Sequence, residues 1–367
     1  MLPRQEDADG GSVVEIRARR RPEKENELQT MTQALPLDIL DLRHFSAADL
    51  KPLLDMENRA WRQQLNWNYR TSIELILHYL DSRVLPGFVA MDGKQVTGYS
   101  FCVYEEAKAV IGDVYAMATS DGRLSAREIE KRLLEHLIEM LQNSPGTERI
   151  EAQLLLHPSG SLSSVFRASG FEIFRRYFMQ MELTGYKPVL LLEPQPGLVM
   201  RPWNEADFTP AAHLIAGAYA GHLDSRINDQ YQSIAGSMRF LHNIIRFPGC
   251  GMFDAAASRV LAEDKTGALK GILLCSQVKD DTAHITQVCV APDCQGLGLG
   301  GMMIEDCTGY LHKRGYHAVT LTVTQQNEGA VRLYERLGFS RMRTFDAMLW
   351  VRPAFSLSRM IEQNGTG

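Results

Sequence analysis

An internal repeat constrains the fold of this 367-residue chain more than any other feature. Residues 113–117 align with residues 287–291, and each segment leads into a turn that contains glycine. Further along the chain, residues 166–171 align with residues 334–339, and both segments end in Gly-Phe. The repeat predicts two copies of one strand-and-helix unit, where length alone would allow two or three domains.

Composition places the boundaries of the two copies. Residues 1–35 mix an arginine-rich run with glutamates and show no apolar period, which predicts disorder; Met31 is an alternative start of the functional chain. The first copy is expected at residues 36–185 and the second at 197–355, with a proline-containing linker at 186–196. A polar tail is expected at residues 356–367.

The second copy contains the glycine-rich turn QGLGLG at residues 295–300. The turn follows a predicted strand at 285–290 and opens a predicted helix at 299–314. Without Cβ atoms, its glycines let the backbone approach a ligand and adopt positive φ. Unpaired N–H groups at a helix start attract anions, so the turn is predicted to bind phosphate, and a pyrophosphate in particular.

Three kinds of phosphate loop have such a turn, and the flanking residues separate them. A P-loop needs Lys and then Ser or Thr after its last glycine, whereas Gly300 is followed by another glycine and two methionines. The GxGxxG of dinucleotide-binding folds is satisfied by residues 296–301. However, the next strand, at 317–324, runs into residues 325–327 without the carboxylate that binds the ribose. A dinucleotide-dependent oxidoreductase is therefore kept only as a third alternative.

The remaining interpretation explains more of the chain. Gln295, Gly298 and Gly300 match a (R/Q)xxGxG pyrophosphate loop, and residues 327–339 match NxxAxxLYxxxGF. Together these motifs resemble the GNAT acetyltransferase superfamily, strongly over about residues 197–355. The arrangement of a degenerate first copy before an intact second copy is similar to that of mycothiol synthases, which acetylate the cysteinyl amine of a sugar-linked thiol.

This resemblance implies acetyl-CoA as the acetyl donor and assigns the residues that hold it. The backbone that pairs with the pantetheine arm would come from Val288, Cys289 and Val290. The pyrophosphate would be held by the side chain of Gln295 and by the backbone amides of Gly296, Leu297, Gly298, Leu299, Gly300 and Gly301. Asn327 matches the residue that bonds the pantetheine, and Tyr334 matches the general acid that protonates the departing thiolate.

Each of these assignments has a purely structural alternative. Asn327 could serve only as a helix N-cap, and Tyr334 could be a core aromatic residue. Cys289 is expected to be a small strand residue rather than a nucleophile. His284 on the same strand could act as a base, although a structural histidine is the more frequent case.

The general base is not identified from the sequence. Many amine-acetylating relatives carry Glu five residues before the motif asparagine, where this chain has Thr322. The candidates in the acceptor half are His222, Asp224, Asp229 and Tyr231, which lie between the first strand and the core sheet of the second copy.

The first copy lacks the residues that carry the chemistry in the second. The positions of Gln295, Gly298, Asn327 and Tyr334 are occupied by Asp121, Leu124, Ser159 and Phe166. A carboxylate would repel the anion, a leucine side chain would block the backbone, and phenylalanine has no hydroxyl to donate. The first copy is therefore predicted to bind acetyl-CoA weakly or not at all.

Composition excludes several other classes of protein. A formal net charge of −5 gives no sign of a nucleic-acid-binding surface, and no apolar run reaches the roughly 20 residues of a membrane helix. The first residues lack a signal-peptide core, so a cytoplasmic location is expected. No metal site is expected, because the cysteines have no CxxC pair and no histidine at ligand spacing; they are Cys102, Cys250, Cys275, Cys289, Cys294 and Cys307.

These observations predict an α/β fold with two tandem GNAT-like domains, each a central mixed β-sheet with helices on both faces. The resemblance implies acetyl-CoA-dependent transfer of an acetyl group to a primary amine of a small molecule or peptide, with the chemistry in the second copy. A non-catalytic acyl-CoA-binding or sensor protein is the alternative, although acyl-CoA binding alone would not need the Tyr334 hydroxyl. The acceptor, the role of the first copy and the oligomeric state are left open.

Overall fold

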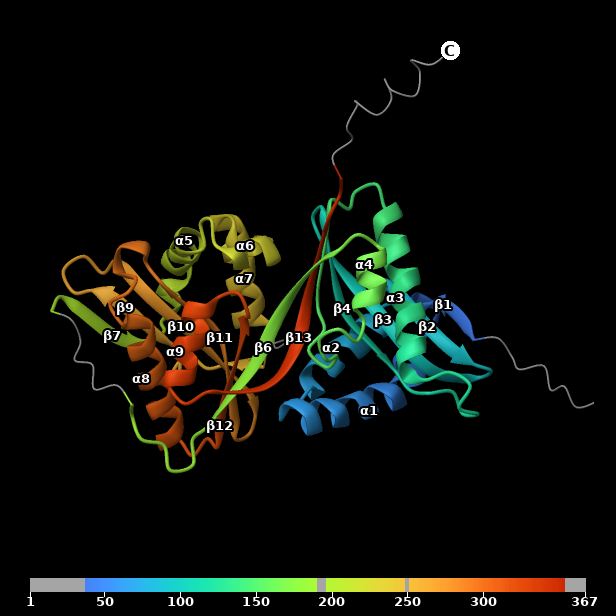
Figure 1. Cartoon of the computed structure of the whole chain (residues 1–367), viewed down its shortest axis with the longest axis horizontal. Coiled ribbons are helices and arrows are strands. Elements are labelled where there is room, and N and C mark those ends of the chain that lie inside the picture. Colours follow the sequence, from blue (N-terminus) through green and yellow to red (C-terminus); the bar gives the residue numbers. More distant parts are fainter. Residues whose placement is uncertain (1–36, 190–195, 248–250, 354–367) are drawn as a thin grey trace, which may run out of the picture. The chain divides into compact units, whose positions relative to one another are not determined.

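The computed structural model describes residues 37–189, 196–247 and 251–353 (Figure 1). The segment predicted to be disordered at 1–35, most of the predicted linker and the predicted tail at 356–367 lie outside these residues. The description below covers the two copies of the repeat.

The first copy contains six strands and four α-helices within the described residues. Its strands are β1 (Asp38–Asp41), β2 (Gly87–Asp92), β3 (Gln95–Glu105), β4 (Lys108–Ala116), β5 (Arg149–Gln153) and β6 (Glu172–Glu182). Its helices are η1 (Leu42–His44), α1 (Ala47–Leu65), α2 (Arg70–Asp81), α3 (Ala126–Asn143) and α4 (Ser163–Ala168), of which η1 is a 3-10 turn.

The second copy follows the same order of strands and helices. Its strands are β7 (Leu198–Pro202), β8 (Met252–Phe253), β9 (Arg259–Glu263), β10 (Leu269–Lys279), β11 (Thr282–Val290), β12 (Ala318–Thr324) and β13 (Ser340–Val351). Its α-helices are α5 (Phe208–Ala218), α6 (Leu223–Ile227), α7 (Ile234–Arg246), α8 (Leu299–Lys313) and α9 (Glu328–Arg336). Its 3-10 turns are η2 (Glu205–Asp207), η3 (Asp229–Tyr231) and η4 (Pro292–Cys294).

Both copies interrupt the same strand with a β-bulge. The pairing of β3 with β4 shifts by one residue and leaves Gly112 as the extra residue. The pairing of β10 with β11 shifts in the same way and leaves Thr286 extra. Each bulge lies one residue before the start of the aligned segments 113–117 and 287–291. The sequence repeat is therefore also a structural repeat, in register down to the bulge.

Beyond each bulge, two parallel strands diverge into a fork. In the second copy, β11 pairs with β12 only as far as Ile285, opposite Leu321. In the first copy, β4 pairs with β5 only as far as Ile111, opposite Ala152. The part of β11 that follows Thr286 therefore keeps backbone groups that no neighbouring strand satisfies on that side.

The last strand of each copy pairs with the other copy. The sheet runs in the order β1-β2-β3-β4-β5-β13-β6-β12-β11-β10-β9-β7, with β8 paired to β10. Thus β13 lies between β5 and β6, with Trp350 opposite Ile150, and β6 lies between β13 and β12, with Thr320 opposite Gln180. Each copy completes its sheet with a strand of the other copy, and the described residues share one 13-stranded sheet.

Helices cover both faces of each half of the sheet. In the first copy, α3 buries Leu133, Leu134 and Leu137 against one face, and α1 and α2 cover the other face. In the second copy, α8 covers one face and α5 and α7 cover the other (Figure 1). The predicted α/β fold, with mixed sheets between helices, is confirmed.

Candidate functional site

A pocket of about 270 Å³ opens at the fork between β11 and β12. One wall is the diverging end of β11, from Ile285 to Val290, and the other is the end of β12. The start of α9 and the segment from α5 to η3 close it, and Gln153 and Arg176 of the first copy also line it.

The glycine-rich turn lies at the β11 end of this pocket. Gly296 and Gly298 both have positive φ, 78° and 77°, in the left-handed region that glycine adopts without steric cost. Gly298 is the N-cap of α8, and its carbonyl accepts the first helical bond from Met302 N, at 3.1 Å. The amides of the first turn of α8 have no helical acceptor, which is the arrangement that binds anions.

The predicted donor-binding residues divide into two groups. Val288, Cys289, Val290, Gln295, Gly300 and Asn327 line the pocket. The other five form the turn and the start of α8 without lining the pocket itself; they are Gly296, Leu297, Gly298, Leu299 and Gly301.

The bulge at Thr286 decides which side chains of β11 face each side of the sheet. After it, Val288 and Val290 pack on the side of α8, whereas Cys289 packs on the side of α5 and α7. Burial raises the pKa of the Cys289 thiol to about 12, so the thiol is protonated at neutral pH. This environment favours the structural interpretation of Cys289 over a nucleophile.

Helix α9 brings two predicted residues to the pocket. Asn327 caps the helix, with its Oδ1 accepting from Ala330 N at 3.3 Å, and it also lines the pocket. The capping role is confirmed, and the bond to pantetheine stays a prediction. Tyr334 is half-buried in the pocket wall. Desolvation raises its pKa to about 12, with Asp224 adding to the rise and Arg176 opposing it. The hydroxyl is therefore a proton donor at neutral pH.

Three of the four candidate acceptor residues line the pocket: His222, Asp224 and Tyr231. Asp224 accepts a hydrogen bond from the Thr324 hydroxyl at the end of β12. The fourth candidate, Asp229, does not line the pocket; its Oδ1 lies 2.6 Å from Lys108 Nζ.

His284 is buried outside the pocket. Its Nδ1 lies 2.8 Å from Thr320 Oγ1, and the centroids of its ring and the Trp67 ring are 4.9 Å apart. Burial, with Arg176 adding to the effect, lowers its pKa to about 3, so the imidazole is neutral. The environment supports the structural interpretation of this histidine.

Several polar lining residues were not predicted from the sequence, among them Gln153, Arg176, Tyr219 and Gln287. Gln153 and Arg176 arrive from the first copy through the exchanged strands, so no motif of the second copy could indicate them. Tyr219 donates to Gln287 Oε1 at 3.0 Å, while Gln287 Nε2 is buried and has no partner among the described residues. An apolar helix pattern around Tyr219 gave no signal of this contact.

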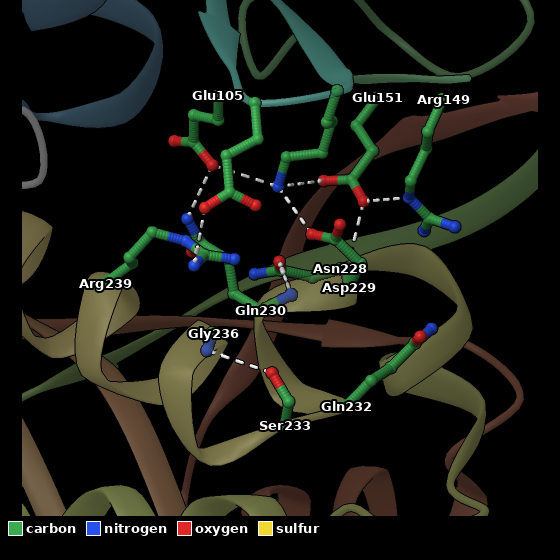
Figure 2. A network of polar contacts seen from close by, with 12 residues as sticks. Glu105, Arg149, Glu151, Asn228, Asp229, Gln230, Gln232, Ser233, Gly236 and Arg239 are labelled. Atoms are coloured by element: carbon green, nitrogen blue, oxygen red, sulfur yellow. Dashed lines mark hydrogen bonds and ion pairs between the residues drawn. The ribbon is translucent and has the colours of Figure 1, made fainter. Parts of the chain in front are cut away.

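The segment from α6 to η3 carries the candidate acceptor residues and is called the acceptor wall below. A buried ion-pair network holds it against the first copy (Figure 2). Lys108 Nζ, on a side chain only 6% exposed, lies 2.6 Å from Asp229, 3.1 Å from Glu105 and 3.4 Å from Glu151. Gln230 Nε2 donates to Glu105 at 2.9 Å. Burial lowers the pKa of Lys108, but the surrounding carboxylates outweigh it and the net shift is upward. The network fixes η3, which carries the pocket residue Tyr231.

The corresponding fork of the first copy is closed. A cavity of about 10 Å³ lies next to the end of β5, lined in part by His157 and Phe166. The His157 imidazole enters the fork, with Nε2 2.9 Å from the carbonyl oxygen of Val114, the residue aligned with Val288. In the turn, the Asp121 carboxylate accepts from Arg123 N at 3.0 Å. Side chains of the first copy therefore fill the positions that a donor would need.

A known protein family matches the part of the chain that carries most of this site. Residues 224–339 match the acetyltransferase (GNAT) family. This part of the chain is similar to GNAT acetyltransferases. The match begins at Asp224 and ends at Phe339, so it includes the glycine-rich turn, α9 and much of the pocket, but not Gln153, Arg176 or Tyr219.

Relatives of the GNAT domain are acetyltransferases with different acceptors in their names. A mycothiol acetyltransferase of Rhodococcus jostii is 46% identical over 57 residues, which is 16% of this chain and 19% of the relative. The [ribosomal protein bS18]-alanine N-acetyltransferase of Escherichia coli is 40% identical over 65 residues, 18% of this chain and 44% of the relative. The matches span less than half the length of these curated relatives.

Solved structures extend the likeness to both copies of the repeat. A GCN5-related N-acetyltransferase of Sphaerobacter thermophilus aligns with a TM-score of 0.61 at 16% identity, covering 88% of this chain and 98% of that one. A tandem GNAT protein from the clavulanic acid biosynthesis pathway aligns with a TM-score of 0.54 at 15% identity, covering 88% and 100%. At these identities the likeness is one of fold: two GNAT-like units in tandem.

Two further observations concern the described residues alone. No helix among them has both the length and the apolar character needed to cross a bilayer. They contain no group of three or more His, Cys, Asp or Glu side chains placed to hold a metal ion. Of the cysteines, Cys102, Cys275, Cys289 and Cys307 are buried, Cys294 is partly exposed, and Cys250 lies outside the described residues.

Proposed function

We propose that this chain is an acetyl-CoA-dependent N-acetyltransferase that acetylates a primary amine of a small molecule or peptide in its second copy. The observation that carries the proposal is a single pocket that joins three parts: an anion-binding turn, an unpaired strand edge and a protonated tyrosine. The acyl-CoA donor has three matching parts, which are a pyrophosphate, a pantetheine amide chain and a thioester.

The donor is proposed to lie along β11. Its pyrophosphate would bind the amides that follow Gly298, and its pantetheine would bond the free backbone edge of Val288 and Val290. Gly300 supports this placement. A Cβ built there would come no closer than 3.9 Å to Val290 or Leu333, so packing within the protein does not require glycine. Close approach of a ligand would require it.

The chemistry is proposed to be direct transfer. The neutral amine attacks the thioester carbonyl carbon, the C–S bond breaks, the amine loses a proton and coenzyme A leaves as a thiol. Tyr334 is protonated at neutral pH and can donate to the departing sulfur. Asp224 is the carboxylate of the pocket and is the proposed acceptor of the amine proton, directly or through water.

The first copy, proposed to span residues 36–185, is assigned a supporting role. It would not bind the donor, because its fork holds the His157 imidazole. It would instead supply β6 to the sheet of the second copy and side chains to the pocket wall.

The test measures acetyl-CoA binding and coenzyme A release with a panel of primary amines. The wild type should bind acetyl-CoA and release coenzyme A with at least one amine. Tyr334→Phe should bind acetyl-CoA as the wild type does, while kcat falls by about 10²-fold or more. Binding of acetyl-CoA without turnover of any amine would favour a sensor, and binding of NAD(P) in place of acetyl-CoA would overturn the proposal.

A further inference from the structure

Arg176 of the first copy brings a positive charge to the pocket of the second copy, which the sequence repeat alone does not predict. It belongs to β6 of the first copy but stands directly opposite Thr324 of β12 in the second, because β6 pairs with β12. Its side chain lines the pocket together with Asp224 and Tyr334. Strand exchange therefore places a guanidinium of one copy in the pocket of the other.

The protein does not neutralise this guanidinium. Among the described residues, Arg176 takes part in no ion pair; Nη1 donates to the Gln153 amide oxygen, and Nη2 donates to Thr322 Oγ1 at 3.4 Å. Its Nε is buried and has no partner. A guanidinium has five N–H donors, so one on Nη1 and one on Nη2 are left for another molecule.

Neighbouring arginines show the contrast. Arg226 pairs with Glu172 at 2.9 Å, and Arg341 pairs with Glu335 at 2.6 Å. Both partners are exposed carboxylates that a surface arginine readily finds. Arg176 is less exposed than these, and partly removing a charge from water without a counter-ion costs free energy. An anion in the pocket would offset that cost and could bind the planar fork bidentately.

The charge also lies within reach of the reacting groups. Arg176 and Asp224 act with opposite signs on the Tyr334 hydroxyl, so both are close enough to influence it. Asp224 is held by Thr324, the residue opposite Arg176 in the strand pair. The glycine-rich turn follows β11, whereas the β6 backbone that carries Arg176 lies beyond β12, so the turn and Arg176 reach the pocket from opposite sides.

We infer that the acceptor is a small amine that also carries a carboxylate or phosphate, bound by Arg176 with Gln153 while Asp224 faces the amine. This inference rests on the proposed function and adds the class of acceptor. Arg176 is a specificity residue of this site, supplied by the first copy.

The experiment compares matched acceptors that differ only in the anion. The pairs are glycine with glycinamide, β-alanine with β-alaninamide, 4-aminobutanoate with 4-aminobutanamide, and phosphoethanolamine with ethanolamine. The wild type should show a kcat/KM at least about tenfold higher for the anionic member of one or more pairs, a difference that one good ion pair can supply. The phosphoethanolamine pair tells a phosphate preference from a carboxylate preference.

Variants of two adjacent arginines make the test specific. Arg176→Gln should reduce the ratio of kcat/KM between the anionic and the neutral amine to about one, mainly through KM. Arg176→Lys should keep part of the preference for the anionic amine. Arg175→Gln is the matched control, because Arg175 is the preceding residue of β6 and is exposed. Among the described residues, its side chain hydrogen-bonds to Ser159 Oγ, at 3.0 Å. It should leave the preference unchanged, and acetyl-CoA affinity should be equal in all four proteins.

The possible failures are distinguishable. If acetyl-CoA binds and neutral amines turn over as well as anionic ones, or if Arg176→Gln keeps the preference, the inference about the acceptor is wrong while the proposed function stands. If no amine in the panel turns over, thermal shifts by the four anionic amines in the presence of coenzyme A provide the readout. Stabilisation of the wild type but not of Arg176→Gln supports the anion site, and equal shifts overturn it.

Discussion

At the scale of single residues, burial decides which of the reactive side chains are available for chemistry. Cys289 and His284 are both on β11, and both are neutral at neutral pH, because burial raises the pKa of the thiol to about 12 and lowers that of the imidazole to about 3. The sequence favoured a structural role for both residues, but it did not show which contacts bury them. His284, for example, packs against Trp67, more than 200 positions earlier in the chain.

A pair of buried carboxyl groups in the first copy leads to a prediction about stability. Burial raises the pKa of Asp113 from 3.8 to about 6, and burial together with Asp113 raises that of Glu57. Between pH 3.8 and about 6 the folded state binds more protons than the unfolded state, so the contribution of Asp113 to stability falls as pH rises through this window. Asp113→Asn should therefore raise the free energy of unfolding at pH 8, by about 1–3 kcal/mol, and by much less at pH 4.

Denaturant unfolding at the two pH values measures this difference. Asp121→Asn is the control with the opposite sign, because backbone and side-chain hydrogen bonds from Arg123 lower the pKa of Asp121 to about 2. It should not stabilise the protein at either pH. A loss of stability in Asp113→Asn at pH 8 would contradict the assignment of an unfavourable buried charge.

At the scale of elements, periodicity placed the strands and helices of the second copy well. The predicted helix at 299–314 is α8, which ends at Lys313, and the predicted strand at 317–324 is β12, which begins at Ala318. The bulge at Thr286 was not predicted, because a bulge depends on the register with β10 rather than on the residues of β11 alone. That bulge decides that Val288 faces α8 while Cys289 faces α5 and α7, and so it shapes the pocket wall.

The glycine-rich turn gives a prediction at this scale. Gly298→Leu copies Leu124 of the first copy and places a side chain at φ 77°, which costs about 1–2 kcal/mol and obstructs the amides of α8. Acetyl-CoA affinity, measured by calorimetry, should fall at least about tenfold, which corresponds to 1.4 kcal/mol.

Gly309→Leu is the matched control on the same helix. A Cβ at Gly309 has no atom within 4 Å and Gly309 is not at a positive φ, so a side chain can leave the helix there without a clash at Cβ, and affinity should not change. Wild-type affinity in a folded Gly298→Leu protein would show that the turn does not hold the donor.

At the scale of the whole molecule, the two copies are not independent structural units. Strand β6 lies between β12 and β13, and β13 lies between β5 and β6. If a protease site is inserted at residues 190–195 and the chain is cleaved there, the two fragments should still co-elute from a gel-filtration column without denaturant. Separate elution of two folded fragments would contradict the exchange of strands.

The Lys108 network connects the first copy to the acceptor wall and gives the last prediction. Lys108→Met would leave Glu105, Glu151 and Asp229 without their shared cation, and breaking a buried pair on one side costs about 3–5 kcal/mol. We expect lower thermal stability and a higher KM for the amine, with acetyl-CoA affinity little changed because the turn lies elsewhere.

Lys51→Met is the control for this change. Lys51 pairs with Asp55 on the surface at 2.8 Å, and an exposed pair of this kind contributes about 0–1 kcal/mol. If Lys108→Met is as stable as Lys51→Met, the network does not hold the wall.

The sequence alone determined the local features of this protein: two copies of one α/β unit, the glycine-rich turn, and the motif that contains Asn327 and Tyr334. Those features depend on short-range properties, namely glycine's freedom at positive φ, helix capping and hydrophobic periodicity. Only the tertiary structure decided that β6 and β13 pair across the copies and that Arg176 therefore enters the pocket. The physical reason is that a strand's own pattern specifies which face is buried but not which strand lies beside it.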